Sequence, residues 1–137
     1  CVLKGSVMFM VDLAKHLKMP LKMEFIKLSS YGSNFTSSGK VNAVDIVLPD
    51  LNDKNVLIIE DIIDSGQTMR KLLETLQQEK VASLEVCTLF FKPENFKGNY
   101  NIKYIGKNIK HDFIVGYGLD LNNKGRNLSC VYQRKIK

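Results

Sequence analysis

The sequence predicts an α/β domain in which helices flank a central, mostly parallel sheet, with a smaller, irregular unit formed by the C-terminal part. Residues 56–59 form an unbroken apolar run, as in a strand that is covered on both faces. Residues 69–76 carry apolar side chains at helical spacing, and residues 84–91 form a second apolar strand pattern. A strand, a helix and a strand within about 35 residues are typical of a βαβ unit with parallel strands.

The other elements follow from patterns along the chain. Apolar residues at helical spacing predict a helix over residues 7–17, which Pro20 ends. Residues 29–40 contain five serines and two glycines, which predicts a mobile loop. Strand-like patterns are predicted at residues 22–28, 41–48, 102–105, 113–117 and 128–132.

Length and composition indicate a single domain over residues 1–137. The hydrophobic content is 45%, and no low-complexity tract or internal repeat is present. No apolar run is long enough to cross a bilayer, and no signal-peptide pattern is present, so we expect a soluble, cytoplasmic protein that does not bind membranes. Cys1-Val2-Leu3 has the pattern of a buried strand end, so we expect that an N-terminal segment precedes it in the full protein.

The net charge and the spacing of the cysteine and histidine residues limit which partners and metal ions the protein is expected to bind. A formal net charge of +6 fits a polyanion, either nucleic acid or a phosphorylated small molecule. No aromatic-rich basic face is visible, so nucleic-acid binding is not favoured. The cysteines (Cys1, Cys87 and Cys130) have no CxxC spacing, which argues against a zinc site. Neither His16 nor His111 lies at metal-ligand spacing, and His111 is expected on a surface loop.

The most informative stretch is residues 55–68, where acidic residues and a small-residue turn separate a strand from a helix. Two adjacent carboxylates, Glu60 and Asp61, follow the apolar run, and Asp64 comes three residues later. Residues 65–68 then open a helix, whose first N–H groups lack partners and can bind an anion. Paired acids beside such a turn suit a ligand that carries a phosphate together with hydroxyl groups or a metal ion.

Candidate residues also follow other predicted strands. Ligands of open parallel sheets bind beyond the C-terminal ends of the strands, so these residues are expected to lie along one edge if the sheet is parallel. They are Lys4, Ser29–Tyr31, Glu60–Thr68, Lys92 and the region around Asp120.

Taken together, these segments resemble the hypoxanthine–guanine phosphoribosyltransferases, the bacterial enzymes more than the animal ones. The similarity covers essentially the whole chain and is carried by residues 3–6, 29–32, 60–66, 89–93 and 112–120. The acidic loop alone indicates only a type I phosphoribosyltransferase. Lys92, Phe113 and Asp120, in this order, narrow the resemblance to the 6-oxopurine branch.

The resemblance implies the type I phosphoribosyltransferase fold, with a small base-binding hood, and an activity in purine salvage. The substrates would be 5-phosphoribosyl diphosphate (PRPP) and hypoxanthine or guanine, the products IMP or GMP and pyrophosphate, and the cofactor Mg²⁺. It also implies a homodimer or homotetramer. The reaction passes through a ribosyl cation-like state, so it requires charge neutralisation, held geometry and a proton acceptor.

The same resemblance assigns roles around the acidic loop. Asp64 is expected to be the general base that accepts the purine proton, with helix N-capping as the alternative interpretation. Glu60 and Asp61 are expected to contact the ribose hydroxyls directly or through Mg²⁺, with a solvated acidic loop as the alternative. The 5′-phosphate is expected to bind Ser65, Gly66, Gln67 and Thr68. Many relatives carry Lys or Arg where Gln67 stands, so weaker phosphate affinity is expected.

Further roles fall on the other loops. Lys4, Gly5 and Arg126 are expected to contact pyrophosphate, although a surface salt bridge is the alternative for Arg126. Lys92 is expected to donate to the purine 6-oxo group. Phe113 is expected to stack on the purine, with a core position as the alternative. The remaining assignments are Ile114 and Val115 to the purine pocket, Asp120 to the purine side and to Mg²⁺, and Ser30 and Tyr31 to a lid.

Two alternative functions stay open. One is a PRPP-sensing regulator that binds nucleic acid, but no helix-turn-helix signature is present, and Asp64 and Lys92 argue against it. The other is transfer to a different base, such as xanthine or a pyrimidine. Lys92 with Phe113 favours a 6-oxopurine and leaves xanthine open.

Overall fold

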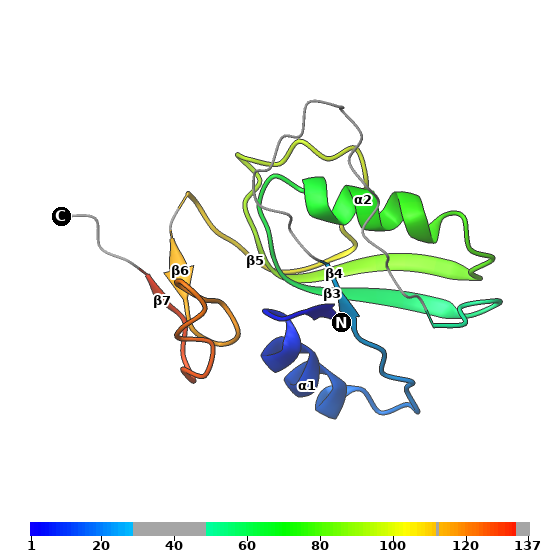
Figure 1. The fold of residues 1–137 in the computed structure, drawn as a ribbon, viewed down its shortest axis with the longest axis horizontal. Helices are drawn as coiled ribbons and strands as arrows, with labels where there is room; N and C mark the ends of the chain where they lie inside the picture. Colours follow the sequence, from blue (N-terminus) through cyan, green and yellow to red (C-terminus); the bar gives the residue numbers. More distant parts are fainter. Residues whose placement is uncertain (29–48, 112, 134–137) are drawn as a thin grey trace.

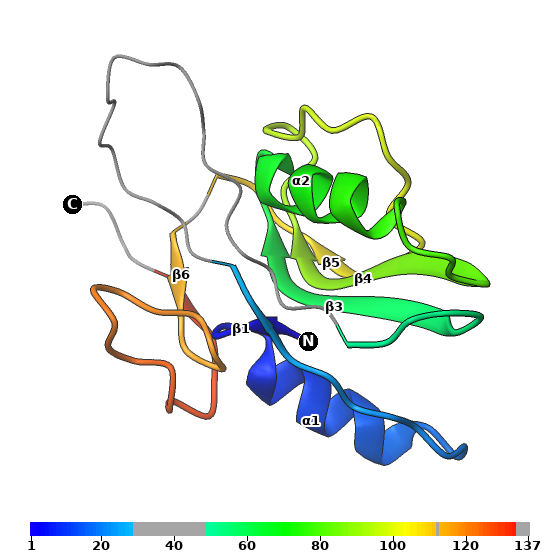
Figure 2. The same cartoon turned by 45° about the vertical axis from the view of Figure 1, so that its right-hand side comes forward.

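The central sheet is parallel, as the sequence predicts. The structure, a computed structural model, describes residues 1–28, 49–111 and 113–133. Its central sheet has the order β3 (Asn55–Ile63), β4 (Ser83–Phe91), β5 (Tyr104–Asn108). Helix α2 (Gln67–Leu76) covers one face of this sheet and α1 (Val7–His16) lies on the other side (Figures 1 and 2). The predicted α/β class is therefore confirmed.

Two smaller sheets complete the described fold. Strands β1 (Val2–Leu3) and β2 (Ile26–Lys27) pair in parallel, and β1 contacts β3. Strands β6 (Ile114–Val115) and β7 (Tyr132–Gln133) pair antiparallel and form a C-terminal unit beside the central sheet (Figure 1). This unit confirms the predicted small hood-like part.

The alternation of side chains along β3 and β4 explains why both strands are apolar. Ile58 pairs in register with Val86, and both pack in the core that includes α2. Ile59 pairs with Cys87, and both pack against Met10 of α1. Successive side chains of a strand point to opposite faces, so a strand covered on both faces requires apolar residues at consecutive positions.

Helix α2 buries one apolar stripe against the sheet. Its buried residues recur at helical spacing and are Met69, Leu72, Leu73 and Leu76. The helix begins after Gly66, whose φ of 77° lies in the left-handed region that favours glycine. The strand–helix–strand unit β3–α2–β4 is thus the one that the sequence predicts.

Strand β3 is longer than its apolar run. We expected Glu60 and Asp61 to follow the strand, but they lie within it, because β3 stays paired with β4 as far as Ile63. The Asp61 carboxylate accepts the N–H of Ile62 at 2.8 Å. The acids therefore sit near the end of a held strand and not on a free loop.

Other boundaries also shift. In the predicted strand at 22–28 only Ile26–Lys27 pairs, and β5 begins two residues later than expected. Residues 113–117 and 128–132 give strands of only two residues each, because turns with positive φ angles occupy the segment between them. The strand predicted at 41–48 and the loop predicted at 29–40 lie outside the described residues. Within the described residues, no helix has the length and apolar character needed to cross a membrane.

Candidate active site

The parallel register of β3 and β4 brings Asp64 and Lys92 together. Ile63 at the end of β3 pairs with Phe91 at the end of β4, so the next residue of each strand reaches the same edge of the sheet. The N–H of Lys92 donates to the carbonyl of Ile63 at 3.0 Å. The Lys92 ammonium donates to Asp64 Oδ2 at 3.1 Å, and the Lys92 side chain is only 11% exposed. The predicted base and the predicted 6-oxo donor are thus direct neighbours.

A second donor holds the other oxygen of Asp64. Asn95 Nδ2 donates to Asp64 Oδ1 at 2.7 Å. Partial burial acts to raise the pKa of Asp64, but the hydrogen bonds from Asn95 and Lys92 outweigh it and leave this pKa below its ordinary value. The carboxyl group is therefore an anion at neutral pH, as a proton acceptor must be.

The helix-capping interpretation of Asp64 is wrong. The N-cap position of α2 is Gly66, and no side chain of the described residues caps the first turn of this helix. The first N–H groups of α2 are therefore available to an anion. The side chains of Gln67 and Thr68 are exposed at the same end of the helix.

The loop that follows β4 donates hydrogen bonds to the turn before α2. The N–H of Lys97 donates to the carbonyl of Ser65 at 3.1 Å, and the Tyr100 hydroxyl donates to the carbonyl of Gly66 at 3.0 Å. A Cβ atom on Gly66 would overlap the rings of Phe96 and Tyr100. In the predicted phosphate-binding turn, the carbonyls of Ser65 and Gly66 therefore already accept hydrogen bonds, and these bonds fix the conformation of the turn.

Glu60, within β3, lies in a poorly solvated position. Burial, together with the adjacent Asp61 carboxyl group, raises the pKa of Glu60 to about 9. Gly5 packs directly against the Asp61 carboxylate, so that a Cβ atom at position 5 would overlap it. The Leu3–Lys4 peptide bond beside this contact is cis. The structure thus places the predicted pyrophosphate segment Lys4–Gly5 against the acidic strand.

The C-terminal unit contacts the Lys4–Gly5 segment as well. A Cβ atom on Gly118 would overlap the carbonyl of Gly5, so the two backbones are in contact. Arg126 Nη1 donates to the carbonyl of Gly118 at 2.8 Å, and Arg126 Nη2 forms an ion pair with Asp120 Oδ1. Asp120 Oδ2 also accepts the N–H of Asn123 at 2.8 Å. Arg126 does form a salt bridge, but its partner is another predicted site residue and both side chains are less than one third exposed.

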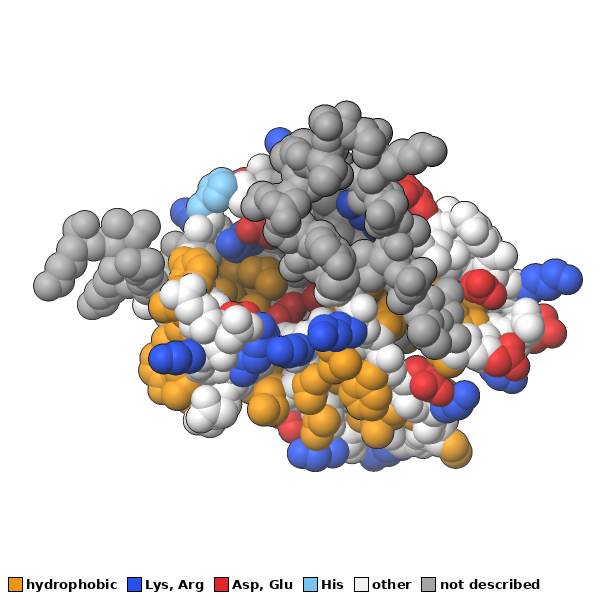
Figure 3. Space-filling model, in the orientation of Figure 1, with side chains coloured by type: hydrophobic (Ala, Val, Ile, Leu, Met, Phe, Trp, Pro, Cys, Tyr) orange, Lys and Arg blue, Asp and Glu red, His pale blue; other side chains and the backbone are white. Residues whose placement is uncertain are grey.

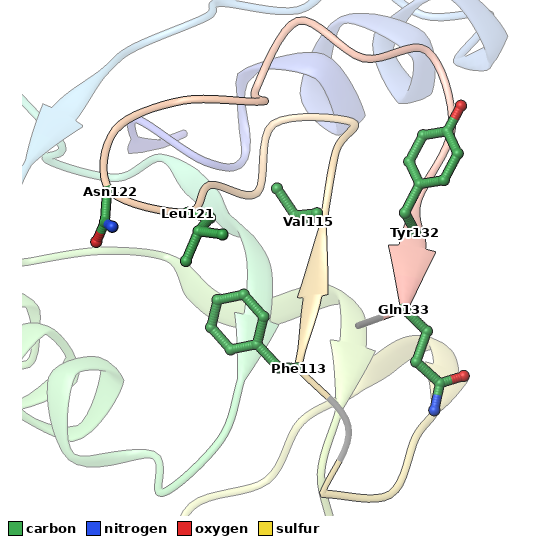
Figure 4. Close-up of a pocket in the computed structure, with 6 residues that line it drawn as sticks. All are labelled: Phe113, Val115, Leu121, Asn122, Tyr132 and Gln133. Atoms are coloured by element: carbon green, nitrogen blue, oxygen red, sulfur yellow. The ribbon is translucent and has the colours of Figure 1, made fainter. Parts of the chain in front are cut away.

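Two of the predicted base-binding residues, Ile114 and Val115, form strand β6 of the small antiparallel sheet, and Phe113 directly precedes this strand. An open cavity of about 470 Å³ is lined by Phe113, Val115, Leu121, Asn122, Tyr132 and Gln133 (Figure 4). Phe113 is 43% exposed, so its core interpretation is wrong. Ile114 lies between Phe113 and Val115 in sequence, and strand alternation directs its side chain to the other face.

The acidic residues partly fit the expected Mg²⁺. Carboxylate oxygens are the donors that Mg²⁺ prefers, and a cation would relieve the repulsion between Glu60 and Asp61. Asp120, however, is engaged by Arg126 and Asn123. The described residues contain no group of three His, Cys, Asp or Glu residues that could hold a metal ion by themselves. The residues therefore fit a Mg²⁺ ion that receives most of its ligands from a bound substrate and water.

The described site residues come from segments far apart in the sequence. Figure 3 shows basic and acidic side chains close together on the face between the central sheet and the C-terminal unit. The predicted lid residues, Ser30 and Tyr31, lie outside the described residues. Three further residues have side chains that bond to the site or to each other, and sequence patterns did not predict this role for them: Asn95, Tyr100 and His111. Only the position of Asn95, just after a strand that carries a candidate residue, pointed toward the site.

Comparison with known proteins places this geometry in a family. A family model described as "phosphoribosyl transferase domain" matches residues 1–122. The chain is 44% identical over 130 residues to the hypoxanthine-guanine phosphoribosyltransferase of Mycobacterium bovis, covering 95% of this chain and 64% of that protein. It is 45% identical to the enzyme of the same name from Staphylococcus epidermidis, covering 95% of this chain and 73% of that protein.

Solved structures of phosphoribosyltransferases superpose closely on this fold. A crystal structure of a hypoxanthine phosphoribosyltransferase from Staphylococcus aureus superposes with a TM-score of 0.85 at 42% identity, over 98% of this chain and 73% of that one. A hypoxanthine-guanine phosphoribosyltransferase from Bacillus anthracis, with a HEPES molecule in its active site, gives a TM-score of 0.84 at 41% identity, over 98% of this chain and 79% of that one. The chain thus spans 64% of the mycobacterial relative, which is less than two thirds of its length. It spans 73% to 79% of the other three proteins named here.

Proposed function

Because the chain belongs to the phosphoribosyl transferase domain family, and within it to the hypoxanthine-guanine phosphoribosyltransferases, we propose that it makes IMP or GMP from PRPP and hypoxanthine or guanine. The observation that carries this proposal is the contact between Asp64 and Lys92 near the start of α2, which no side chain in the described part of the chain caps. It combines a proton acceptor, a donor for an oxo group and a phosphate-binding turn at one edge of a parallel sheet.

The proposed mechanism follows from these groups. The N–H groups of the first α2 turn bind the 5′-phosphate and fix the ribose, while Lys92 donates to the 6-oxo group of the purine. Asp64, an anion at neutral pH, accepts the proton of the attacking purine nitrogen as the bond to the ribose carbon forms. Arg126 and the Lys4–Gly5 segment bind the departing pyrophosphate.

The cofactor and the assembly belong to the same proposal. Glu60, Asp61 and Asp120 would hold Mg²⁺, directly or through water, and the bound ion would supply charge neutralisation to the pyrophosphate group. The proposed assembly is a homodimer or homotetramer of the single domain 1–137. The proposed location is the cytoplasm, because PRPP is highly charged and does not cross membranes unaided.

The proposal is tested by a spectrophotometric assay with PRPP and Mg²⁺ against hypoxanthine, guanine, xanthine and adenine. We expect turnover of hypoxanthine or guanine and none of adenine, because Lys92 is a donor and adenine carries a donor amino group where the oxo group stands. Turnover of xanthine or adenine alone would contradict the proposed base class. Absence of turnover with every base would contradict the enzymatic proposal.

The Asp64→Asn variant tests the proposed base. The amide keeps the shape of the side chain but does not accept the proton, so we expect kcat to fall by about 10²–10⁴-fold. Glu79→Gln, which neutralises an exposed acid beyond the far end of α2, is the matched control and should retain the activity of the unmodified chain. Equal loss in both variants, or in neither, would show that Asp64 is not the base.

A further inference from the structure

A three-residue chain of hydrogen bonds runs through Asn95. Its Nδ2 donates to Asp64 Oδ1 at 2.7 Å and lies 3.0 Å from His111 Nδ1. The three residues follow the ends of three neighbouring strands, β3, β4 and β5. The N–H of Ile109 donates to the carbonyl of Phe91 at 2.8 Å, which holds the segment leading to His111 beside the loop that carries Asn95.

The chemistry of the amide group fixes the direction of this chain. An asparagine NH₂ group carries two hydrogens, so one is available to the Asp64 carboxylate and the other to His111. His111 Nδ1 is then the acceptor, which assigns the tautomer with its proton on Nε2. An amide turned the other way would direct its oxygen at the carboxylate, and both atoms are acceptors. The Asp64 carboxylate therefore fixes the amide orientation in which Asn95 donates to it, and His111 Nδ1 accepts the second hydrogen of the same NH₂ group and holds the amide in place.

The two donors on Asp64 differ in what they do when a purine is present. Lys92 holds Oδ2 in this structure, yet the proposed function requires the same ammonium to donate to the purine oxo group. Asn95 has no such second task among the roles assigned above. When Lys92 turns to the purine, Asn95 remains to hold the carboxylate in one orientation.

We propose that Asn95, held in place by His111, is the positioning residue of Asp64 in the phosphoribosyl transfer reaction. This inference rests on the proposed function for the role of Asp64, but the contact itself does not. Asn95 orients the Asp64 carboxylate so that one oxygen faces the purine proton, and it stabilises the anionic form by a charge-assisted hydrogen bond. The other charged or titratable groups in contact with Asp64 or Asn95 in the described structure are Lys92 and His111.

The first test compares Asn95→Leu, which removes the donor at similar volume, with Asn99→Leu, which makes the same change at an exposed position of the same loop. We expect Asn95→Leu to lower kcat by about 10-fold or more, because a small misplacement of a reacting group is costly, and to leave the KM for PRPP within about twofold. Asn99→Leu should match the unmodified chain. Thermal unfolding of all three chains shows whether each variant is folded.

The second test reads Asp64 directly and does not depend on turnover. Titration of the Asp64 carboxyl carbon by NMR should show a higher pKa in Asn95→Leu than in the unmodified chain, because the anion has lost a donor. His111→Asn keeps an acceptor near the position of Nδ1 and should preserve kcat, whereas His111→Phe removes it and should lower kcat in the same direction as Asn95→Leu.

The outcomes separate the inference from the proposed function. An active unmodified chain with an unchanged kcat and an unchanged Asp64 pKa in Asn95→Leu would overturn the inference. A fall in PRPP affinity with kcat unchanged would also overturn it, because that pattern indicates a role in substrate binding. An inactive unmodified chain would overturn the proposed function, and a raised Asp64 pKa in Asn95→Leu would still support the contact.

Discussion

Asp64 shows how a single side chain acquires its chemistry from neighbours. It lies at the edge of the sheet, about half exposed, and its two oxygens accept from Lys92 and Asn95. These donors favour the anion over the neutral acid, so the pKa of Asp64 is lowered in spite of the partial burial. An isolated aspartate at the same position would be ionised at neutral pH as well, but it would lack a fixed orientation.

The lowered pKa of Asp64 predicts a pH dependence. The proposed base must be an anion to accept a proton, so kcat/KM for hypoxanthine should stay level as the pH falls to the ordinary aspartate range and should drop only below it. Stability follows the same sign, since a depressed folded-state pKa contributes stability above the unfolded value that is lost as pH falls through the folded value. In Lys92→Met the pKa of Asp64 should rise, and the acid limb of the kcat/KM profile should move to higher pH. An acid limb that does not move would show that Lys92 does not act on Asp64.

Gln67 is the residue at which this chain departs from many relatives. Its side chain is exposed at the start of α2, where the 5′-phosphate is proposed to bind. Gln67→Lys adds a cation to this turn, so we expect the Kd for PRPP to fall by about 3–5-fold, the effect of about 1 kcal/mol for an exposed charge-assisted contact. Isothermal titration calorimetry with PRPP and Mg²⁺ measures it, and Gln78→Lys, beyond the far end of α2, is the control for added charge. An equal gain in both variants would mean that the effect is not local.

At the residue scale, the sequence is least informative about which side chains contact one another in the site. The acids of the 60–64 stretch and Lys92 are visible as candidates because they follow apolar runs. Asn95 and His111 carry no periodic pattern and stand in loops, so only the three-dimensional course of those loops shows that they meet. Their pairing was therefore not predictable from composition or spacing.

At the scale of elements, α2 connects the core to the site. Its buried stripe fixes the helix on the sheet, and its first turn is the proposed phosphate site. The sequence predicted this helix and the two strands around it because their apolar patterns are long. It misplaced β5, whose five residues are all exposed and show no alternation, so that only the backbone pairing with β4 defines this strand.

The core contact of α2 predicts a stability effect. Leu72 is fully buried, so Leu72→Ala should lower the free energy of unfolding by about 2–5 kcal/mol, through lost apolar contact and the remaining cavity. Chemical denaturation measures this change. Lys71→Ala, at the adjacent exposed position of α2, should alter the stability by less than about 0.5 kcal/mol. A similar effect in both variants would mean that α2 does not pack as described.

At the scale of the whole molecule, the site joins parts of the chain that are distant in sequence. The Lys4–Gly5 segment meets the end of β3, and the C-terminal unit meets Gly5 through Gly118. The sequence predicted that candidate residues converge on one edge, but not how the C-terminal unit docks. That docking depends on backbone contacts and on positive φ angles at Tyr117 and Gly118, which leave no apolar pattern.

This assembly predicts that ligand binding stabilises the domain as one unit. PRPP with Mg²⁺ at about 100 times its Kd should raise the free energy of unfolding by about 2.7 kcal/mol, because only the folded chain binds. Differential scanning calorimetry should show a single transition that moves to higher temperature with PRPP. Inorganic sulfate at the same ionic strength is the control for general anion effects. Two transitions, of which only one moves, would show that the C-terminal unit unfolds separately.

The contact of Gly5 with Asp61 on one side and Gly118 on the other has a consequence for inheritance. Every single-base change that replaces a glycine introduces a larger side chain or stops translation, so neither position can change its residue without adding atoms or ending the chain. The two failures should differ in kind. At position 5 the new atoms meet a carboxylate that can swing aside, so the protein should accumulate in the cell yet lose function. At position 118 they meet backbone at a φ of 97°, so the protein should be degraded before it can act.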